Sequence, residues 1–191
     1  MSADRKPPVV FLEGEHLYLR PLELSDLDRC HRWINDPQTR LPLGSFLPAS
    51  EKAEREYIEN ATGTQDNIQF AIVLKDGDRH IGGTGLHDVR WKDRAAVFGL
   101  LIGEKDFRGK GYGGEATRLM LRYAFETLNL NRVELWVFAS NQPAIRAYEK
   151  SGYVREGIRR EYSFIEGKYV DSFVYSILAR EYFADRAGGT L

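Results

Sequence analysis

The chain has 191 residues, a length that fits one domain of the usual size, about 100 to 200 residues. Apolar residues make up 42% and charged residues 29%, which favours a soluble globular protein over a disordered or fibrous one. The formal net charge of -1 offers no bulk attraction for nucleic acid or an anionic membrane. The single cysteine, Cys30, excludes an intrachain disulfide and a thiolate metal cluster.

No apolar run approaches the roughly 18 residues that a membrane span requires, and the first residues lack the apolar core of an export signal. We therefore expect a cytoplasmic protein with neither a membrane nor a nucleic acid as partner. The polar ends predict an N-terminal tail over residues 1–12 and a C-terminal tail over residues 184–191. A single domain is expected over residues 13–183.

The first half of the chain alternates between strand and helix patterns. The Pro- and Gly-rich segment 36–48 predicts a loop, positioned as a flap over a substrate. Glycines at 82, 83 and 85 suggest a bulge or a close backbone approach. The other elements expected are a strand over 16–22, a helix from a Ser25 cap to 36, a second helix from a Ser50 cap to 61, and a hairpin around Asp76-Gly77-Asp78.

The second half contains a βαβ unit. The almost continuous apolar run 94–103 predicts a buried strand, which a Gly-rich turn connects to an amphipathic helix over 115–130. Another buried strand is expected over 132–138, parallel to the first because a helix joins them. A shorter helix should begin at Asn141 and end at Gly152, before a hairpin that turns at Glu166-Gly167. The pattern predicts a mixed α/β sheet.

The Gly-rich turn "RGKGYGGEAT", residues 108–117, suits a phosphate at a helix N-terminus. It is not a nucleotide triphosphate P-loop, because Gly113-Gly114 is followed by Glu115. It does match G-x-G-x-x-G of dinucleotide-binding proteins. However, Glu134 lies near the start of the following strand, whereas a ribose-binding acid should lie at its end. A nicotinamide-dependent oxidoreductase therefore remains the third hypothesis.

A third match is (Gln/Arg)-x-x-Gly-x-(Gly/Ala), at Arg108, Gly111 and Gly113. Downstream, N-x-x-A-x-x-x-Y-x-x-x-G-(Phe/Tyr) is found in register from Asn141 through Tyr148 to Tyr153. Over residues 16–182 the chain thus resembles the GNAT N-acetyltransferases, and its late hairpin resembles the branch of ribosomal-protein N-terminal and spermidine acetyltransferases. The resemblance implies a mixed, mostly antiparallel central sheet with one splayed parallel strand pair and flanking helices.

The resemblance also implies direct transfer of an acetyl group from acetyl-CoA to a primary amine, without a metal. The backbone near Leu101 could bind the acetyl carbonyl oxygen, and Arg108 and Lys110 would add positive charge beside the pyrophosphate. The implied acetyl-CoA-binding residues are Leu100, Leu101, Ile102, Arg108, Gly109, Lys110, Gly111, Tyr112, Gly113, Gly114, Asn141, Ala144 and Tyr148.

Tyr148 is the candidate general acid, since a phenol is protonated at neutral pH and can donate to the departing thiolate. The base stays open. Some relatives place a glutamate where this chain has Trp136, and Glu134 lies two residues earlier on the same strand face. The further candidates are Glu104, His87 and Asp106, or a chain of water molecules.

The acceptor amine is expected between the segment 36–48 and the late hairpin, which carries Tyr162, Phe164 and Tyr169. Its aromatic residues suggest a peptide or a small amphipathic amine, whereas acidic residues nearby favour a polycation. The competing hypothesis is a non-catalytic CoA-binding regulatory module. A homodimer is one expected assembly. The acidic residues that favour a polycationic acceptor are Asp36, Glu51, Glu54 and Glu56.

Overall fold

The protein folds around one eight-stranded sheet, seen in a computed structural model that describes residues 8–61 and 65–187. The strand order is β1-β2-β3-β4-β5-β6-β8-β7, and every neighbouring pair is antiparallel except β5 and β6. The strands are β1 (Leu12–Glu13), β2 (Leu17–Pro21), β3 (Ile68–Leu74), β4 (Arg79–Arg90), β5 (Ala95–Ile102), β6 (Arg132–Phe138), β7 (Val154–Ile165) and β8 (Lys168–Leu178).

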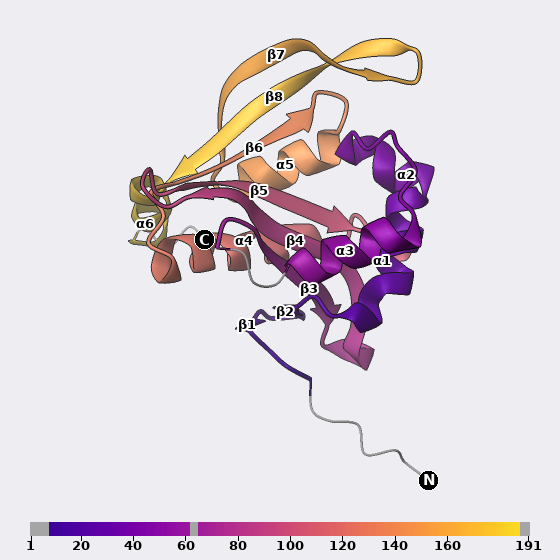
Figure 1. The fold of residues 1–191 in the computed structure, drawn as a ribbon. Coiled ribbons are helices and arrows are strands. Elements are labelled where there is room, and N and C mark those ends of the chain that lie inside the picture. Colours follow the sequence, from indigo (N-terminus) through magenta and orange to yellow (C-terminus); the bar gives the residue numbers. More distant parts are fainter. Residues whose placement is uncertain (1–7, 62–64, 188–191) are drawn as a thin grey trace.

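Helices cover both faces of the sheet (Figure 1). The α-helices are α1 (Leu27–Asn35), α2 (Pro37–Arg40), α3 (Glu51–Ala61), α4 (Tyr112–Arg122), α5 (Gln142–Lys150) and α6 (Ala179–Ala187). Short 3-10 turns are η1 (Leu24–Asp26), η2 (Leu41–Leu43), η3 (Asp76–Asp78) and η4 (Lys105–Phe107), and a π-helical turn, η5 (Tyr123–Thr127), extends α4.

Each face of the sheet has its own apolar core. The larger one joins strand residues such as Ile72 and Val133 to Met120 of α4 and Ile145 of α5. The smaller one joins Val73 to α1 and α3 on the opposite side. We call these sides the α4/α5 face and the α1/α3 face. None of the described helices is long and apolar enough to cross a membrane.

The predicted fold class and most predicted elements are confirmed. Asn141 caps α5 by accepting a hydrogen bond from the Ala144 backbone, and Gly152 follows the helix with a φ of +90°. Ser50 Oγ accepts from the Ala53 backbone at the start of α3. The late hairpin turns through two residues of positive φ, Glu166 and Gly167, as a tight turn between twisted strands requires.

Several boundaries differ from the prediction. The segment 36–48 is not a plain loop, because Asp36 caps the short helix α2 and Pro37 occupies its first turn. Ser25 lies inside η1, where Glu23 and Asp26 form the capping box instead. α6 occupies 184–187, part of the predicted tail, whereas 188–191 and 1–7 lie outside the described residues. Near the other end, Phe11 stacks on Phe70 and so belongs to the packed domain.

Candidate active site

The two parallel strands separate after three residue pairs. β5 and β6 are in register from Ala95 opposite Arg132 to Val97 opposite Glu134, and β5 continues to Ile102 without a β6 partner (Figure 1). Backbone groups that face a missing neighbour are free to bind a ligand. We call the end of this pairing the divergence point.

Successive residues of β5 turn their backbone groups to opposite sides. The Leu101 carbonyl points at β4, since a Cβ added to Gly82 would meet that oxygen at 2.1 Å. The Ile102 carbonyl points away from β4 and accepts from Arg108 Nε at 2.9 Å. By alternation, Leu100 and Ile102 face the divergence, whereas the Leu101 backbone is used within the sheet. The suggested role of the Leu101 N-H therefore passes to Leu100.

The Gly-rich turn leads into α4 with an unusual N-terminus. Gly111 is the N-cap with a φ of +90°, and no side chain caps the free N-H groups of the first turn. A Cβ at Gly111 would meet nothing within 4 Å, so backbone conformation rather than space requires glycine here. Lys110, Gly111 and Tyr112 line a hollow of about 240 Å³ at this helix end. Free N-H groups, the helix dipole and lysine suit an anion.

Arg108 does not face that hollow. Its guanidinium donates to Thr39 Oγ1 at 2.7 Å and to the Gln38 carbonyl at 3.1 Å, both in α2. It also donates to the carbonyls of Ile102 and, at 3.3 Å, Gly103 at the end of β5. The side chain therefore ties α2 to β5 and is not free to pair with phosphate.

Arg118 is a binding candidate that sequence reasoning missed. It lines the hollow at the start of α4, and its Nη1 lies 3.5 Å from the place a Cβ on Gly114 would occupy. The available signal was its position one turn after Gly114 on the same helix. Glu115 also borders this hollow, and its carboxylate is held to the first strand hairpin by accepting hydrogen bonds from the backbone N-H groups of His16 and Leu17.

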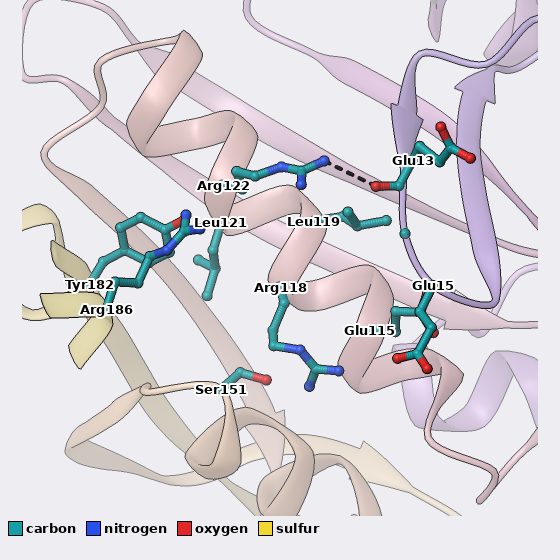
Figure 2. A pocket seen from close by; sticks show the side chains of 11 residues that line it. Glu13, Glu15, Glu115, Arg118, Leu119, Leu121, Arg122, Ser151, Tyr182 and Arg186 are labelled. Carbon is teal, nitrogen blue, oxygen red and sulfur yellow. Dashed lines mark hydrogen bonds between the residues drawn. The ribbon is translucent and has the colours of Figure 1, made fainter. Parts of the chain in front are cut away.

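A second hollow, of about 350 Å³, extends along the outer side of α4 (Figure 2). Glu15 and Glu115 lie at one end of it, Tyr182 and Arg186 of α6 lie at the other, and Arg118 lies between them. Arg122 borders it and donates to the Glu13 carbonyl. This hollow lies beside the body of the helix and not at the divergence point, so we place no reaction in it.

Tyr148 of α5 lies on the α4/α5 face beside the divergence point. Its ring makes an edge contact with Phe98, the first β5 residue beyond the paired segment, and with Tyr153. Burial raises the pKa of Tyr148 to about 12, so its hydroxyl stays protonated at neutral pH. Within the described residues, no hydrogen bond engages that hydroxyl. Such a phenol can donate a proton to a group that arrives between the strands.

Two of the three predicted acidic bases are already engaged. Glu134 forms ion pairs with Arg90 and with Arg132. Glu104 accepts from Arg32 at 2.6 Å and from Trp33 Nε1 at 3.2 Å. Because both carboxylates are already held by donors of neighbouring elements, this geometry argues against both as the group that meets the acceptor amine.

The other two candidate bases differ in where they lie. Asp106 lies exposed in η4, outside the strands. His87 is half-buried on the α1/α3 face, where it lies over Gly99. Trp136 is on the same face and stacks with Arg159.

The segment 36–44 bridges the ends of the separating strands. On the β5 side it is tied by Arg108 and by an ion pair of 2.8 Å between Asp36 and Lys105. On the β6 side a Cβ at Gly44 would meet Phe138 at 3.2 Å. The predicted flap is therefore a helical turn that borders the open ends of the splayed strands on the α1/α3 side.

No group of three or more His, Cys, Asp or Glu residues in the described part of the chain is arranged to hold a metal ion. The proton chemistry described above relies on side chains and backbone alone.

Comparison with known proteins identifies this arrangement. The profile of the acetyltransferase (GNAT) domain matches residues 16–154. The chain belongs to the GNAT acetyltransferase family. It is 30% identical to the N-acetyltransferase p20 of Bacillus licheniformis over 90% of this chain and 97% of that protein. YdaF of Bacillus subtilis, provisionally named a ribosomal N-acetyltransferase, is 32% identical over 91% of this chain and 97% of its own.

Polyamine acetyltransferases are similar as well. Spermidine N(1)-acetyltransferase of Vibrio cholerae is 31% identical over 88% of this chain and 96% of that protein. A crystal structure of spermidine N-acetyltransferase from Vibrio cholerae with CoA and spermine superimposes with a TM-score of 0.82 at 28% identity. It covers 88% of this chain and 98% of that one.

The protein is thus an acetyl-CoA-dependent N-acetyltransferase, and the predicted family, activity and cosubstrate are confirmed. The site fits acetyl-CoA: α4 offers uncapped N-H groups to a pyrophosphate, and β5 offers unpaired backbone to the pantetheine arm. The nicotinamide hypothesis is wrong, because the sheet is mostly antiparallel and the chain belongs to another family.

Proposed function

We propose that the protein acetylates the α-amino group at the N-terminus of a protein or peptide whose first residues carry apolar side chains. The supporting observation is a set of exposed apolar side chains near the open ends of the splayed strands. Three follow α2 in the segment that borders the splayed strands: Leu43, Phe46 and Leu47, the last two with exposed fractions of 80% and 65%. Exposed aromatic and aliphatic groups of this kind commonly form binding surfaces.

Further aromatic residues extend this surface over β6 and the late hairpin. Trp136 projects from the part of β6 that has no β5 partner, and the Arg159 guanidinium lies 4.9 Å from its ring centre and 5.0 Å from that of Tyr162. At the hairpin tip, the exposed rings of Phe164 and Tyr169 pack together. The hairpin and α2 extend toward the same end of the molecule in Figure 1. Apolar peptide side chains suit such a surface.

Charge supports a peptide over a polyamine. Among the acidic residues that could attract a polycation, Asp36 pairs with Lys105, Glu51 with Arg55 and Glu56 with Lys52. Burial raises the pKa of Glu54, which disfavours its charged form. Because three of these carboxylates are paired with cations and the fourth is buried, these residues provide a weak field for a ligand with several ammonium groups.

Polyamines are the second candidate, on the similarity to the spermidine acetyltransferases. The test is release of free thiol from acetyl-CoA with a panel of acceptors. Peptides with a free N-terminus are compared with the same peptides blocked at Nα, and with spermidine, spermine, aminoglycosides and amino sugars. We expect turnover with free N-termini and none with their blocked partners. Faster turnover of spermidine than of every peptide would contradict the proposed acceptor.

We propose further that Tyr148 is the general acid and that anion contacts come from Lys110, Arg118 and the α4 N-terminus. We place the enzyme in the cytoplasm, acting without nucleic acid or membrane, in keeping with the net charge of -1. The homodimer stays a prediction, which sedimentation equilibrium would test. Binding of acetyl-CoA without thiol release across the whole panel would favour the regulatory hypothesis instead.

A further inference from the structure

One glycine makes room for a histidine just beyond the divergence point, and a second makes room for the glutamine beside it. His87 of β4 is in register with Val97 of β5, which pairs with Glu134 of β6, so all three share the α1/α3 face. Gly99 is the next β5 residue on that face, beyond the last β5–β6 pair. A Cβ on Gly99 would lie 2.8 Å from His87 Nε2, so the imidazole occupies the space that any other residue's Cβ would take.

A neighbouring amide holds this ring in place. Gln69 Nε2 lies 3.1 Å from His87 Nδ1 and 3.2 Å from Nε2. The same amide nitrogen donates to Asn67 Oδ1 at 2.8 Å. A Cβ on Gly85 would meet Gln69 Oε1 at 2.6 Å, so this second glycine makes room for the amide. Two close approaches that only glycine permits thus place a Gln–His pair beside the unpaired end of β5.

The reaction needs a proton acceptor at this place. Tyr148 lies beside Phe98 on the α4/α5 face, whereas His87 lies over Gly99 on the opposite face, next along the strand. A donor and an acceptor of protons on opposite sides of β5 suit a transfer in which one proton leaves the amine and another reaches the sulfur.

We infer that His87 is the proton acceptor of the transfer reaction, and this inference rests on the proposed function. The amine reaches the site as R-NH2, and its nitrogen forms a C-N bond to the acetyl carbon. That nitrogen loses one proton to the unprotonated ring nitrogen of His87, the one that accepts from Gln69 in the structure described, the C-S bond breaks, and Tyr148 donates its proton to the sulfur. The products are the amide and CoA thiol; the imidazolium releases its proton to solvent and the phenolate regains one from it.

The charges around His87 suit this role. Burial lowers the pKa of His87, so the ring is neutral, and able to accept a proton, at pH 7. The charged side chains on the same face of the flanking strands include Arg90 of β4 and Arg132 and Glu134 of β6, and Glu134 pairs with both arginines. Gln69 of β3 and Val97 and Gly99 of β5 bring no charge. Activity should therefore fall as pH drops below the pKa of the imidazole.

The test is the pH dependence of kcat/KM for the best acceptor peptide in wild type, His87→Gln and the control His31→Gln. His31 lies on α1 with its Nε2 near the Ala49 carbonyl, away from the divergence point. An α-amino group has a pKa of about 8, so below that value one proton must leave the acceptor. In a plot of log kcat/KM against pH, all three proteins should then show a slope of one below about pH 8. At lower pH the slope should rise to two in wild type and in His31→Gln, because there His87 must also lose a proton.

In His87→Gln we expect kcat/KM to fall about 100-fold, with the slope staying one throughout and the KM for acetyl-CoA little changed. His87→Ala should regain activity with added imidazole, which a merely structural role would not allow. CoA titration and thermal unfolding check that the variants fold. The pH dependence of wild-type kcat/KM tests the assignment even if a variant fails to fold.

A wild-type slope that never exceeds one, or a His87→Gln enzyme as active as wild type, would overturn the assignment of His87 and leave the proposed function intact. If the wild-type protein acetylates no amine in the panel, the proposed function and this assignment fail together.

Discussion

Replacing Arg108 with alanine is expected to destabilise the fold much more than it weakens CoA binding. The motif suggested a phosphate contact, but the guanidinium is hydrogen bonded to α2 and to the end of β5. Lys110, two residues later, is the matched control. It is exposed, lines the hollow at the start of α4, and makes a cation–π contact of 5.3 Å with Phe107.

The magnitude follows from the number and length of the contacts. Three hydrogen bonds of 2.7, 2.9 and 3.1 Å would be lost with Arg108, along with a weaker one of 3.3 Å. At about 1 kcal/mol net for each good bond, and with a discount because the side chain is only half-buried, the loss is about 2–3 kcal/mol. For a chain of this length each kcal/mol lowers Tm by about 2–4 °C, so we expect a fall of roughly 4–12 °C.

Differential scanning calorimetry and CoA titration separate the two roles. Lys110→Ala should leave Tm within about 2 °C of wild type, since exposed charges contribute little to stability. Its CoA affinity should fall about fivefold, the equivalent of roughly 1 kcal/mol for one charge contact. The structural role of Arg108, as a tie between α2 and β5, is refuted if Arg108→Ala keeps the wild-type Tm and weakens CoA binding more than Lys110→Ala does.

Three more substitutions test other parts of the structure. Tyr148→Phe should lower kcat at least tenfold without changing CoA affinity, measured by thiol release; an unchanged kcat would remove it as the acid. Gly111→Ala should cost about 1–2 kcal/mol in urea unfolding because its φ is +90°, whereas Gly157→Ala, with open space and no positive φ, should be nearly neutral. Burial alone would raise the pKa of Asp26, but hydrogen bonds from Arg20 and His80 outweigh it and hold the pKa well below its usual range. Asp26→Asn should therefore cost about 3–5 kcal/mol at pH 7, and the loss should shrink as wild-type stability falls below about pH 4.

The predictions that succeeded depend on local chemistry. Asn141 caps α5 through a bond to a backbone only three residues away, and Gly152 can take a positive φ at no steric cost. Residues 132–138 form a strand because apolar residues recur there at strand spacing, and the helix before them requires the parallel pairing with β5. The family resemblance is likewise carried by short segments with fixed spacing.

The predictions that failed concern contacts between distant segments. The direction of Arg108 depends on Gln38 and Thr39, about 70 residues earlier, which the motif could not include. The engagement of Glu134 by Arg90 depends on how β4 and β5 align beyond a register shift. Helix α2 forms within a Pro-rich segment because Asp36 caps it and the end of β5 holds it.

The sequence by itself determined the order of elements, the Gly-rich anion cradle and the family, because capping, turn geometry and apolar periodicity act over a few residues. Only the tertiary structure decided which charged groups are already paired and which side chains meet at the divergence point. His87 shows the difference: its ring lies over Gly99 because strand pairing sets the register of β4 and β5, and the absence of a Cβ leaves room for it. Hydrogen bonding between strands sets that register, which neither residue specifies alone.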